Sequence, residues 1–280
     1  MNNFIHPCLW FDGNAKDAAD FYCSIFNNSK VTANTPLVVN FEIEGIKIMG
    51  LNGGPMFKIN PSISLFITCE TDDEIETLWQ KLSDGGSTMM TLQKYPWSEK
   101  YGWLVDKFGM TWQLMLGKLP LDGQKIVSSL LFVGTQYGKA QEAINHYTSI
   151  FKNSFIHFLD IYKDGEEQPE GNLKFGYFSL DGVQFAAMDG IGDHNFKFNE
   201  AVSFVVECNT QEEIDYYWEH LISNGGAEVQ CGWLLDKFGV SWQIIPKSIA
   251  SLVTNPENGS RAMQAMMKMK KINIEALKNA

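Results

Sequence analysis

The chain has 280 residues, of which 45% are hydrophobic and 20% charged, and its formal net charge is -11. These totals are typical of a soluble globular protein with two ordinary domains, and the acidic balance argues against a nucleic-acid partner, which requires a basic face. The five cysteines are scattered without a Cys-x-x-Cys pair, which indicates reduced thiols in a cytoplasmic protein. No signal peptide and no apolar stretch of membrane-spanning length is apparent, so we expect no membrane contact.

The chain opens with the pattern of a strand, a helix and three further strands. Residues 4–11 are mostly apolar or aromatic, which predicts a strand. Residues 15–27 carry Ala18, Tyr22 and Ile25 at helical spacing, which predicts an amphipathic helix. Three short strands are expected near 29–35, 37–43 and 46–51.

The same pattern restarts at residue 62. A strand over 62–69 precedes a helix that begins at Thr71, an N-cap with Glu74 three residues on, and ends at the Gly85-Gly86 pair. Three more strands follow, and the last two form a hairpin. The first part of the chain therefore contains two strand-helix-strand-strand-strand modules.

The hairpin over residues 102–115 has a turn whose residues set its register. A type I turn favours Asp at its first position and Gly at its fourth, which Asp106 and Gly109 supply. We expect a three-residue loop with Gly109 in the left-handed region, so that Asp106 lies opposite Met110. Trp103 then lies opposite Gln113 on one face, and an indole beside a carboxamide suits a small-molecule site.

The hairpin occurs twice, because residues 232–243 repeat it and place Trp233 opposite Gln243. Other segments repeat as well, which indicates a duplicated α+β protein built from four modules. The matching segments are 21–26 with 146–151, 57–60 with 196–199, and 75–86 with 214–226. We predict a first domain over 1–118, a second over 125–247, and a C-terminal helical tail over 248–280.

The tail has alanine, methionine and isoleucine side chains three or four residues apart, with basic residues between them. This spacing predicts an amphipathic helix over 260–278. Such a helix could bind a partner or a membrane surface. We favour a helix that docks on the protein's own domains or across a homodimer, because its basic residues suit the acidic chain.

Several motifs of the chain resemble the PhnB-like branch of the vicinal oxygen chelate superfamily, whose members often bear the label demethylubiquinone methyltransferase-like. The resemblance implies paired βαβββ modules whose curved sheets enclose a site. It also implies relatives that are glyoxalases, dioxygenases, fosfomycin-modifying enzymes or bleomycin binders. The motifs are residues 9–13, 18–22, 51–55, 231–233, 236–243 and 266–271.

The resemblance also implies where a metal would bind, since superfamily enzymes usually draw ligands from the first and last strand of each module. A catalytic divalent site needs about three nitrogen or charged oxygen ligands. His6 alone is a strong ligand type at these positions, so we expect no metal, or His6 if one binds. The positions are His6, Met49, Ser62 and Gln113, then Val127, Ala186, Ala201 and Gln243.

The methyltransferase label gains no support from the glycine-rich segments. The segment 134–139 lacks the length and the final Ser or Thr of a phosphate loop, and no helical pattern follows Gly190-Ile191-Gly192. We therefore expect no cofactor.

The remaining candidates are polar or aromatic residues that the fold would place around a site. We predict a small-molecule-binding protein, or an enzyme without a glyoxalase-type metal site. A superfamily enzyme acting on a small or aromatic substrate and an interaction protein that assembles through its tail remain alternatives. The predicted ligand-binding residues are Trp103, Gln113, Asn52, Trp233, Gln243 and Asp189.

Overall fold

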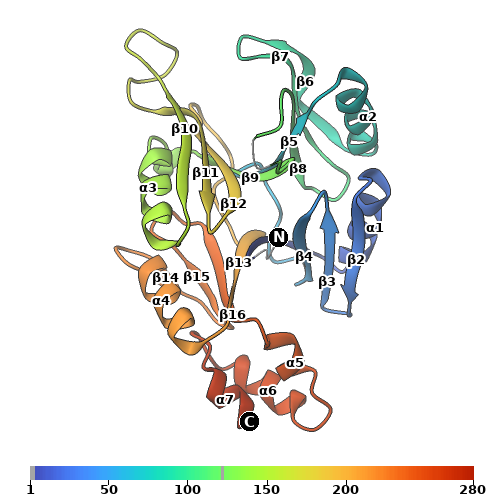
Figure 1. Cartoon of the computed structure of the whole chain (residues 1–280), viewed down its shortest axis with the longest axis vertical. Helices are drawn as coiled ribbons and strands as arrows, with labels where there is room; N and C mark the ends of the chain where they lie inside the picture. Colours follow the sequence, from blue (N-terminus) through green and yellow to red (C-terminus); the bar gives the residue numbers. More distant parts are fainter. Residues whose placement is uncertain (1–3, 121–122) are drawn as a thin grey trace. The chain divides into compact units, whose positions relative to one another are not determined.

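The structure is a computed structural model that describes residues 4–120 and 123–280. The chain divides into two compact units, residues 7–202 and residues 4–6 with 203–280. Four βαβββ modules follow one another along the sequence (Figure 1), which confirms the predicted α+β fold class.

The first two modules have bounds close to those that the sequence predicts. The first contains β1 (Ile5–Phe11), α1 (Ala15–Ile25), β2 (Ser29–Asn34), β3 (Val38–Ile43) and β4 (Ile46–Asn52). The second contains β5 (Ile63–Cys69), α2 (Asp72–Ser83), β6 (Ser87–Tyr95), β7 (Ser98–Val105) and β8 (Thr111–Leu116).

The third and fourth modules repeat this order. The third contains β9 (Ile126–Phe132), the 3-10 turn η1 (Gly134–Gln136), α3 (Ala140–Ile150), β10 (Phe155–Ile161), β11 (Leu173–Leu180) and β12 (Val183–Asp189). The fourth contains β13 (Val202–Cys208), α4 (Gln211–Leu221), β14 (Ala227–Glu228), β15 (Trp233–Leu235) and β16 (Ser241–Pro246). The β14–β15 hairpin of the fourth module is much shorter than the corresponding β6–β7 hairpin of the second module.

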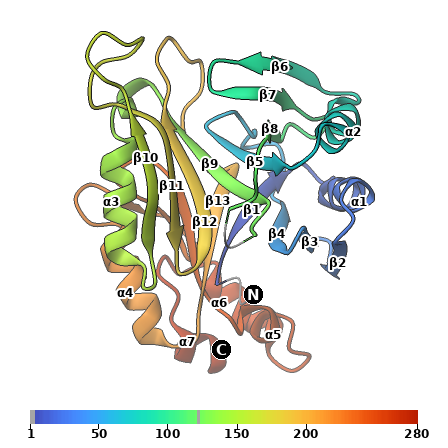
Figure 2. The same cartoon turned by 45° about the horizontal axis from the view of Figure 1, so that its top comes forward.

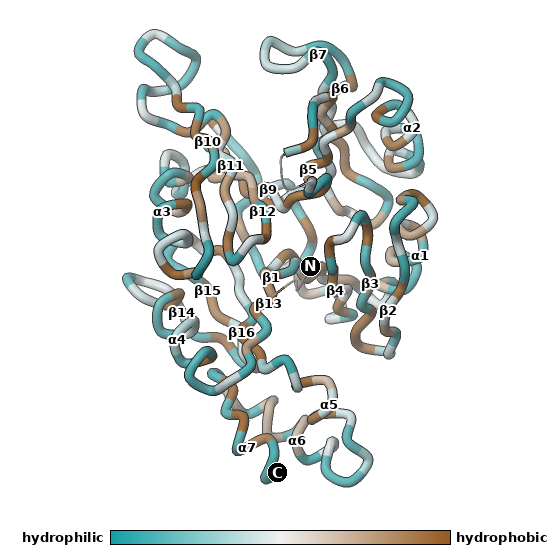
Figure 3. Tube along the Cα trace, viewed as in Figure 1, coloured by the Kyte–Doolittle hydropathy of each residue, from teal (hydrophilic) through white to brown (hydrophobic). Residues whose placement is uncertain are grey.

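The first unit contains an eight-stranded sheet that combines the second and third modules. Its strand order is β10-β11-β12-β9-β5-β8-β7-β6, so the central pair β5 and β9 joins strands from the two sequence repeats. Helices α2 and α3 cover its outer face (Figures 1 and 2). We call the opposite face the inner face. Hydrophobic and hydrophilic residues alternate along the strands (Figure 3), which is the pattern of strands with two distinct faces.

The rest of the first unit is a four-stranded arrangement with α1 packed on it. Its order is β1-β4-β3-β2, with β1 and β4 parallel and the other pairs antiparallel. Trp112 of β8 packs against Tyr22 of α1 and against Phe26, the residue that follows this helix. Helix α1 therefore also contributes to the core on the outer side of β8.

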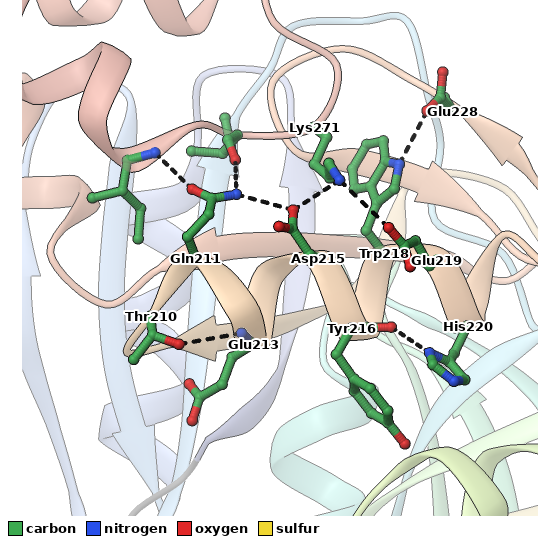
Figure 4. Close-up of polar contacts among 12 residues, drawn as sticks. Thr210, Gln211, Glu213, Asp215, Tyr216, Trp218, Glu219, His220, Glu228 and Lys271 are labelled. Atoms are coloured by element: carbon green, nitrogen blue, oxygen red, sulfur yellow. Dashed lines mark hydrogen bonds and ion pairs between the residues drawn. The ribbon is translucent and has the colours of Figure 1, made fainter.

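Two of the helices begin at the same kind of N-cap. Thr71 accepts a hydrogen bond from the Glu74 amide over 3.2 Å, and the Glu74 carboxylate accepts one from the amide of Glu70, the residue before the cap, over 2.9 Å. Thr210 accepts from the Glu213 amide in the same way (Figure 4). The predicted cap at Thr71 is therefore confirmed.

The second unit contains β14, β15, β16 and β13 in that order, with α4 packed on β15 and β16. The tail continues from β16 as three short helices. These helices are α5 (Ile249–Val253), α6 (Gly259–Met266) and α7 (Ile274–Lys278).

The tail is helical but not one continuous helix as its spacing predicts, because residues 267–273 break the helix. Two carbonyl groups in this break accept hydrogen bonds from backbone amides of the β14–β15 loop. The Met269 carbonyl accepts from the Cys231 amide, and the Lys270 carbonyl accepts from the Gly232 amide, both over 2.8 Å. Ile272 is fully buried here. Contacts with the loop thus replace the helical hydrogen bonds.

Ion pairs and hydrogen bonds also attach the tail to α4 (Figure 4). The Lys271 ammonium lies 2.7 Å from the Asp215 carboxylate, and the side-chain amide of Gln211 donates from Nε2 to the carbonyl of Ile272 over 3.0 Å. The Ile274 amide donates back to Gln211 over 2.9 Å. None of the helices in the described part of the chain is long and apolar enough to span a membrane.

Candidate functional site

The β7–β8 hairpin has the predicted register. The Asp106 amide donates to the Met110 carbonyl over 2.8 Å, and the Gly109 amide donates to the Asp106 carbonyl over 3.0 Å. Gly109 has a φ of +88°, the left-handed conformation that this turn requires. Trp103 pairs with Gln113 as expected, and both side chains belong to the inner face.

The Asp106 carboxylate fixes this hairpin from inside the core. One oxygen accepts hydrogen bonds from the amides of Phe108 and Met110 over 2.8 and 3.0 Å, and the other accepts from Trp112 Nε1 and the Tyr22 hydroxyl, both over 2.8 Å. Burial raises the pKa of Asp106 above its ordinary value, and these four hydrogen bonds act in the opposite direction. The role of Asp106 is therefore structural.

The second hairpin has the same arrangement. Asp236 accepts hydrogen bonds from the amides of Phe238 and Val240 over 2.9 and 3.0 Å and from Trp242 Nε1 over 2.9 Å. The shared sequence of the two hairpins thus encodes a turn bound by its own aspartate. The spacing Asp-x-x-Gly-x-x-Trp, present in both hairpins, is the sequence signal for this arrangement.

A chain of three hydrogen-bonded side chains occupies the centre of the inner face. The Tyr101 hydroxyl donates to Gln113 Oε1 over 2.7 Å, and Gln113 Nε2 donates to Ser64 Oγ over 2.6 Å. All three residues are buried. Desolvation by burial, with a smaller contribution from Tyr95, raises the pKa of Tyr101, so its hydroxyl stays a donor. We call Tyr101, Gln113 and Ser64 the polar centre.

Apolar and aromatic side chains from nine further positions surround the polar centre. Phe66 of β5 and Phe175 of β11 have ring centroids 5.7 Å apart, although a flat sheet would separate their strands by about 14 Å. The sheet therefore curves toward its inner face. We call the following set the inner-face cluster: Phe66, Tyr101, Val127 and Ala186, with Met90, Tyr95, Trp103, Met115, Phe175 and Tyr177 packed against them.

Three buried polar atoms of the inner face have no hydrogen-bond partner within the described residues. They are Trp103 Nε1, Ser129 Oγ and Gln184 Oε1. Ser129 lies opposite Ser64 on β5 and opposite Ala186 on β12. Because buried polar atoms are nearly always paired in native proteins, these atoms mark where a bound molecule or water would contribute.

A family model described as 3-demethylubiquinone-9 3-methyltransferase matches residues 3–115 and again residues 124–245. The chain belongs to this family. The two matches correspond to the two sequence repeats, so the predicted membership in the PhnB-like family is confirmed. No curated protein matches the chain.

Solved structures show what the PhnB-like chain is similar to. The PhnB protein of Bacillus cereus is 36% identical over 40% of this chain and 98% of its own, with a TM-score of 0.38. A protein from Staphylococcus aureus is 28% identical over 41% of this chain and 96% of its own, with a TM-score of 0.20. Glyoxalase I from Zea mays is 10% identical over 86% of this chain and 91% of its own, with a TM-score of 0.56. The last similarity shows the fold alone.

Two of the predicted site residues cap helices. Asn52 Oδ1 accepts a hydrogen bond from the Ala15 amide over 2.9 Å at the start of α1. Asp189 Oδ1 accepts from the amides of Gly138 and Ala140 over 2.8 and 3.2 Å at the start of α3, and its other oxygen accepts from Leu173. The hydrogen bonds of both side chains go to the backbone, which gives these residues a capping role. The Asp189 carboxylate also occupies the position at which a phosphate would meet this helix.

The second tryptophan–glutamine pair lies on β15 and β16 in the second unit. Trp233 pairs with Gln243 as predicted, and Gln243 Nε2 donates to Ser203 Oγ over 2.9 Å. The position that matches Tyr101 holds Cys231, which cannot reproduce the tyrosine–glutamine hydrogen bond. The first unit therefore has the more complete polar centre.

The donors of the inner face do not fit a divalent metal ion. The sequence places possible metal positions at Ser62 and Val127 on the first strands of their modules. In the structure the neighbour of Gln113 is Ser64, and the neighbour of Ala186 is Ser129. All these donors are neutral, whereas catalytic metal sites use imidazole, thiolate or carboxylate. Over residues 4–120 and 123–280, no group of three or more His, Cys, Asp or Glu side chains is placed to hold a metal. His6 is buried near the start of β1, in the second unit.

Proposed function

We propose that this PhnB-like protein binds a neutral, planar small molecule on the inner face of the eight-stranded sheet. The observation that carries the proposal is the polar centre of Tyr101, Gln113 and Ser64 with the unpaired indole N–H of Trp103 beside it. A site with large aromatic area and few oriented polar groups is typical of small-molecule recognition.

The donors and acceptors of the face define the chemistry of the molecule. Trp103 Nε1 can only donate, so the bound molecule supplies an acceptor such as a carbonyl oxygen at this point. Neither the polar centre nor the inner-face cluster contains a charged side chain. Because a buried charge without a counter-ion is costly, an anion or cation would bind poorly.

Binding suits these residues better than catalysis does. The raised pKa of Tyr101 keeps its hydroxyl protonated, and Gln113 and Ser64 offer no general base. The five described cysteines are free thiols, which suits a reducing compartment, and we extend the proposal to a cytoplasmic protein on this ground.

Calorimetric titration with three matched naphthalenes tests this proposal. We expect 2-acetylnaphthalene to bind more tightly than naphthalene, which lacks an acceptor, and than 2-naphthoate, which is charged. The variant Trp103→Phe removes the donor but keeps an aromatic ring, so it should lower the affinity for 2-acetylnaphthalene about fivefold and leave naphthalene unaffected.

The variant Trp233→Phe is the matched control, because Trp233 occupies the same hairpin position in the second unit. It should leave the affinity for all three probes unchanged. Equal affinity of the wild-type protein for the three probes, or no binding of any of them, would overturn the proposal.

A further inference from the structure

The turn between β6 and β7 holds an exposed tryptophan in a fixed position. Trp97 is 61% exposed, yet its ring stacks on Tyr95 with centroids 5.0 Å apart and planes inclined by 21°. Its ring also meets Tyr101 edge-on, with centroids 5.9 Å apart and planes inclined by 72°. A single exposed aromatic side chain is ordinary, but these contacts orient one large face of the indole toward solvent.

These rings connect the turn with the polar centre. Tyr95 packs against the inner-face cluster and contacts Tyr101 with ring centroids 5.7 Å apart. Tyr101 donates the hydrogen bond to Gln113 that begins the polar centre. Trp97 and Gln113 thus both contact Tyr101, Trp97 through its ring and Gln113 through the tyrosine hydroxyl.

Local hydrogen bonds hold the turn in this shape. The Tyr95 hydroxyl donates to the Thr91 carbonyl over 3.0 Å, and the Ser98 hydroxyl donates to the Lys100 carbonyl over 2.9 Å. Lys94 and Glu99 pair across the two strands at 2.8 Å. The indole of Trp97 is thus positioned before any ligand arrives, which lowers the entropic cost of a contact with it.

The fold itself does not require this aromatic turn. The matching hairpin of the second unit has a two-residue β14 and a three-residue β15, and residues 229–232 connect them without an aromatic side chain. The backbone of that loop pairs with the tail at Cys231 and Gly232. The longer hairpin with Tyr95 and Trp97 is therefore an addition to the module that carries the polar centre.

We propose that Trp97 binds the part of the ligand farthest from the polar centre. It would thereby select for molecules that are two aromatic rings long. The acceptor group would lie at Trp103 and Gln113, and a second apolar ring would stack on the open face of Trp97. This inference rests on the proposed function of the inner face. It narrows the ligand class to elongated, neutral aromatic molecules with an acceptor at one end.

Titration with 4-acetylbiphenyl and acetophenone, which share the acceptor group and differ by one ring, tests the inference. The variant Trp97→Ala should weaken binding of 4-acetylbiphenyl about fivefold to tenfold and leave acetophenone unchanged. Trp97→Phe keeps a stacking ring and should retain most of the affinity. Met56→Ala is the control for loss of an exposed apolar side chain, since Met56 is 76% exposed on the loop after β4.

The outcomes separate this inference from the proposed function. If the wild-type protein binds neither probe, the proposed function itself fails. If both probes bind and Trp97→Ala affects neither, or weakens both equally, the role of Trp97 is wrong while the inner-face site stands. The thermal unfolding temperature of Trp97→Ala should match that of Met56→Ala, which excludes a folding defect.

Discussion

Trp112 donates its indole N–H to the buried carboxylate of Asp106, and the two side chains thereby join the turn of the β7–β8 hairpin to the core beneath it. The variant Asp106→Ala would leave four donors without their acceptor, three of them in buried hydrogen bonds. Each such loss costs about 1–3 kcal/mol, so we expect the free energy of unfolding to fall by more than about 3 kcal/mol. Urea denaturation measures it, with Asp193→Ala, an exposed residue, as the control. A loss below about 1 kcal/mol would contradict this structural role.

The pH dependence of stability should reveal the same carboxyl group. Burial raises the folded-state pKa of Asp106 above its ordinary value of 3.8, so the protonated form is favoured in the folded protein. Its contribution to stability is complete below pH 3.8 and is lost as the pH rises through the folded-state pKa.

Asp106→Asn cannot titrate and provides the reference for this measurement. The free energy of unfolding of the wild type minus that of Asp106→Asn should decrease as the pH rises above about 4 and then become constant. Subtraction cancels the other carboxyl groups, including Glu228, whose pKa is lowered by its hydrogen bonds with Trp218 and Lys270. A difference that increases with pH would show that the hydrogen bonds outweigh the desolvation.

The register of the hairpin was predictable because its cause is local. Asp106 and Gly109 lie three residues apart, and the turn they form decides which residues lie opposite each other. The cap at Thr71 was predictable for the same reason. Local geometry also explains why the four modules could be recognised from short motifs.

The composition of the site was less predictable because it depends on distant parts of the chain. Phe66 and Phe175 meet only because β5 and β9 pair, and no local signal specifies that pairing. The side-chain oxygen of Asn52 accepts a hydrogen bond from the Ala15 amide, 37 residues earlier in the chain, and no local signal in the sequence specifies this contact. The roles of such residues follow from the order of strands, which the periodicity of one sequence does not contain.

Two variants of the tail should show how much a buried apolar side chain and how much an exposed ion pair contribute to its attachment. Ile272 is fully buried, so Ile272→Ala should lower the free energy of unfolding by about 2–5 kcal/mol. Lys271 is 34% exposed in its ion pair with Asp215, so Lys271→Ala should cost less than about 1 kcal/mol. Urea denaturation of both variants makes the comparison.

Deletion of the chain after Pro246 should destabilise the protein at least as much as Ile272→Ala does, because it also removes the hydrogen bonds to Cys231 and Gly232. Size-exclusion chromatography of the truncated protein would show whether the surface thus uncovered changes the oligomeric state. Unchanged melting temperature and elution volume would mean that the tail is free for a partner.

Metal content gives a prediction about the donor set. Because the polar centre offers only neutral side-chain donors, protein purified without chelator should carry far less than one equivalent of Zn, Ni, Mn or Fe. Elemental analysis of the wild type and of His6→Ala provides the test. A stoichiometric metal that disappears in His6→Ala would show that a ligand set around His6 has been overlooked.

The two tryptophans of the β7–β8 hairpin should respond differently to truncation, because they lie on opposite faces of the sheet. Trp112 is fully buried against Tyr22 and Phe26, and Trp112→Ala would leave a cavity and an unpaired Asp106 oxygen. We expect a cost of about 3–5 kcal/mol in the free energy of unfolding. Trp103 is only half-buried in the inner-face cluster, so Trp103→Ala should cost clearly less.

Ligand binding should show the opposite order. Trp103→Ala removes both the ring and the unpaired N–H of the inner face, so its affinity for 2-acetylnaphthalene should fall below the range of calorimetry. Trp112→Ala, studied under conditions where most of it remains folded, should bind the probe with nearly wild-type affinity. Equal destabilisation by the two changes, together with equal affinities for the probe, would return Trp103 to the structural core and remove the basis for a site at Gln113.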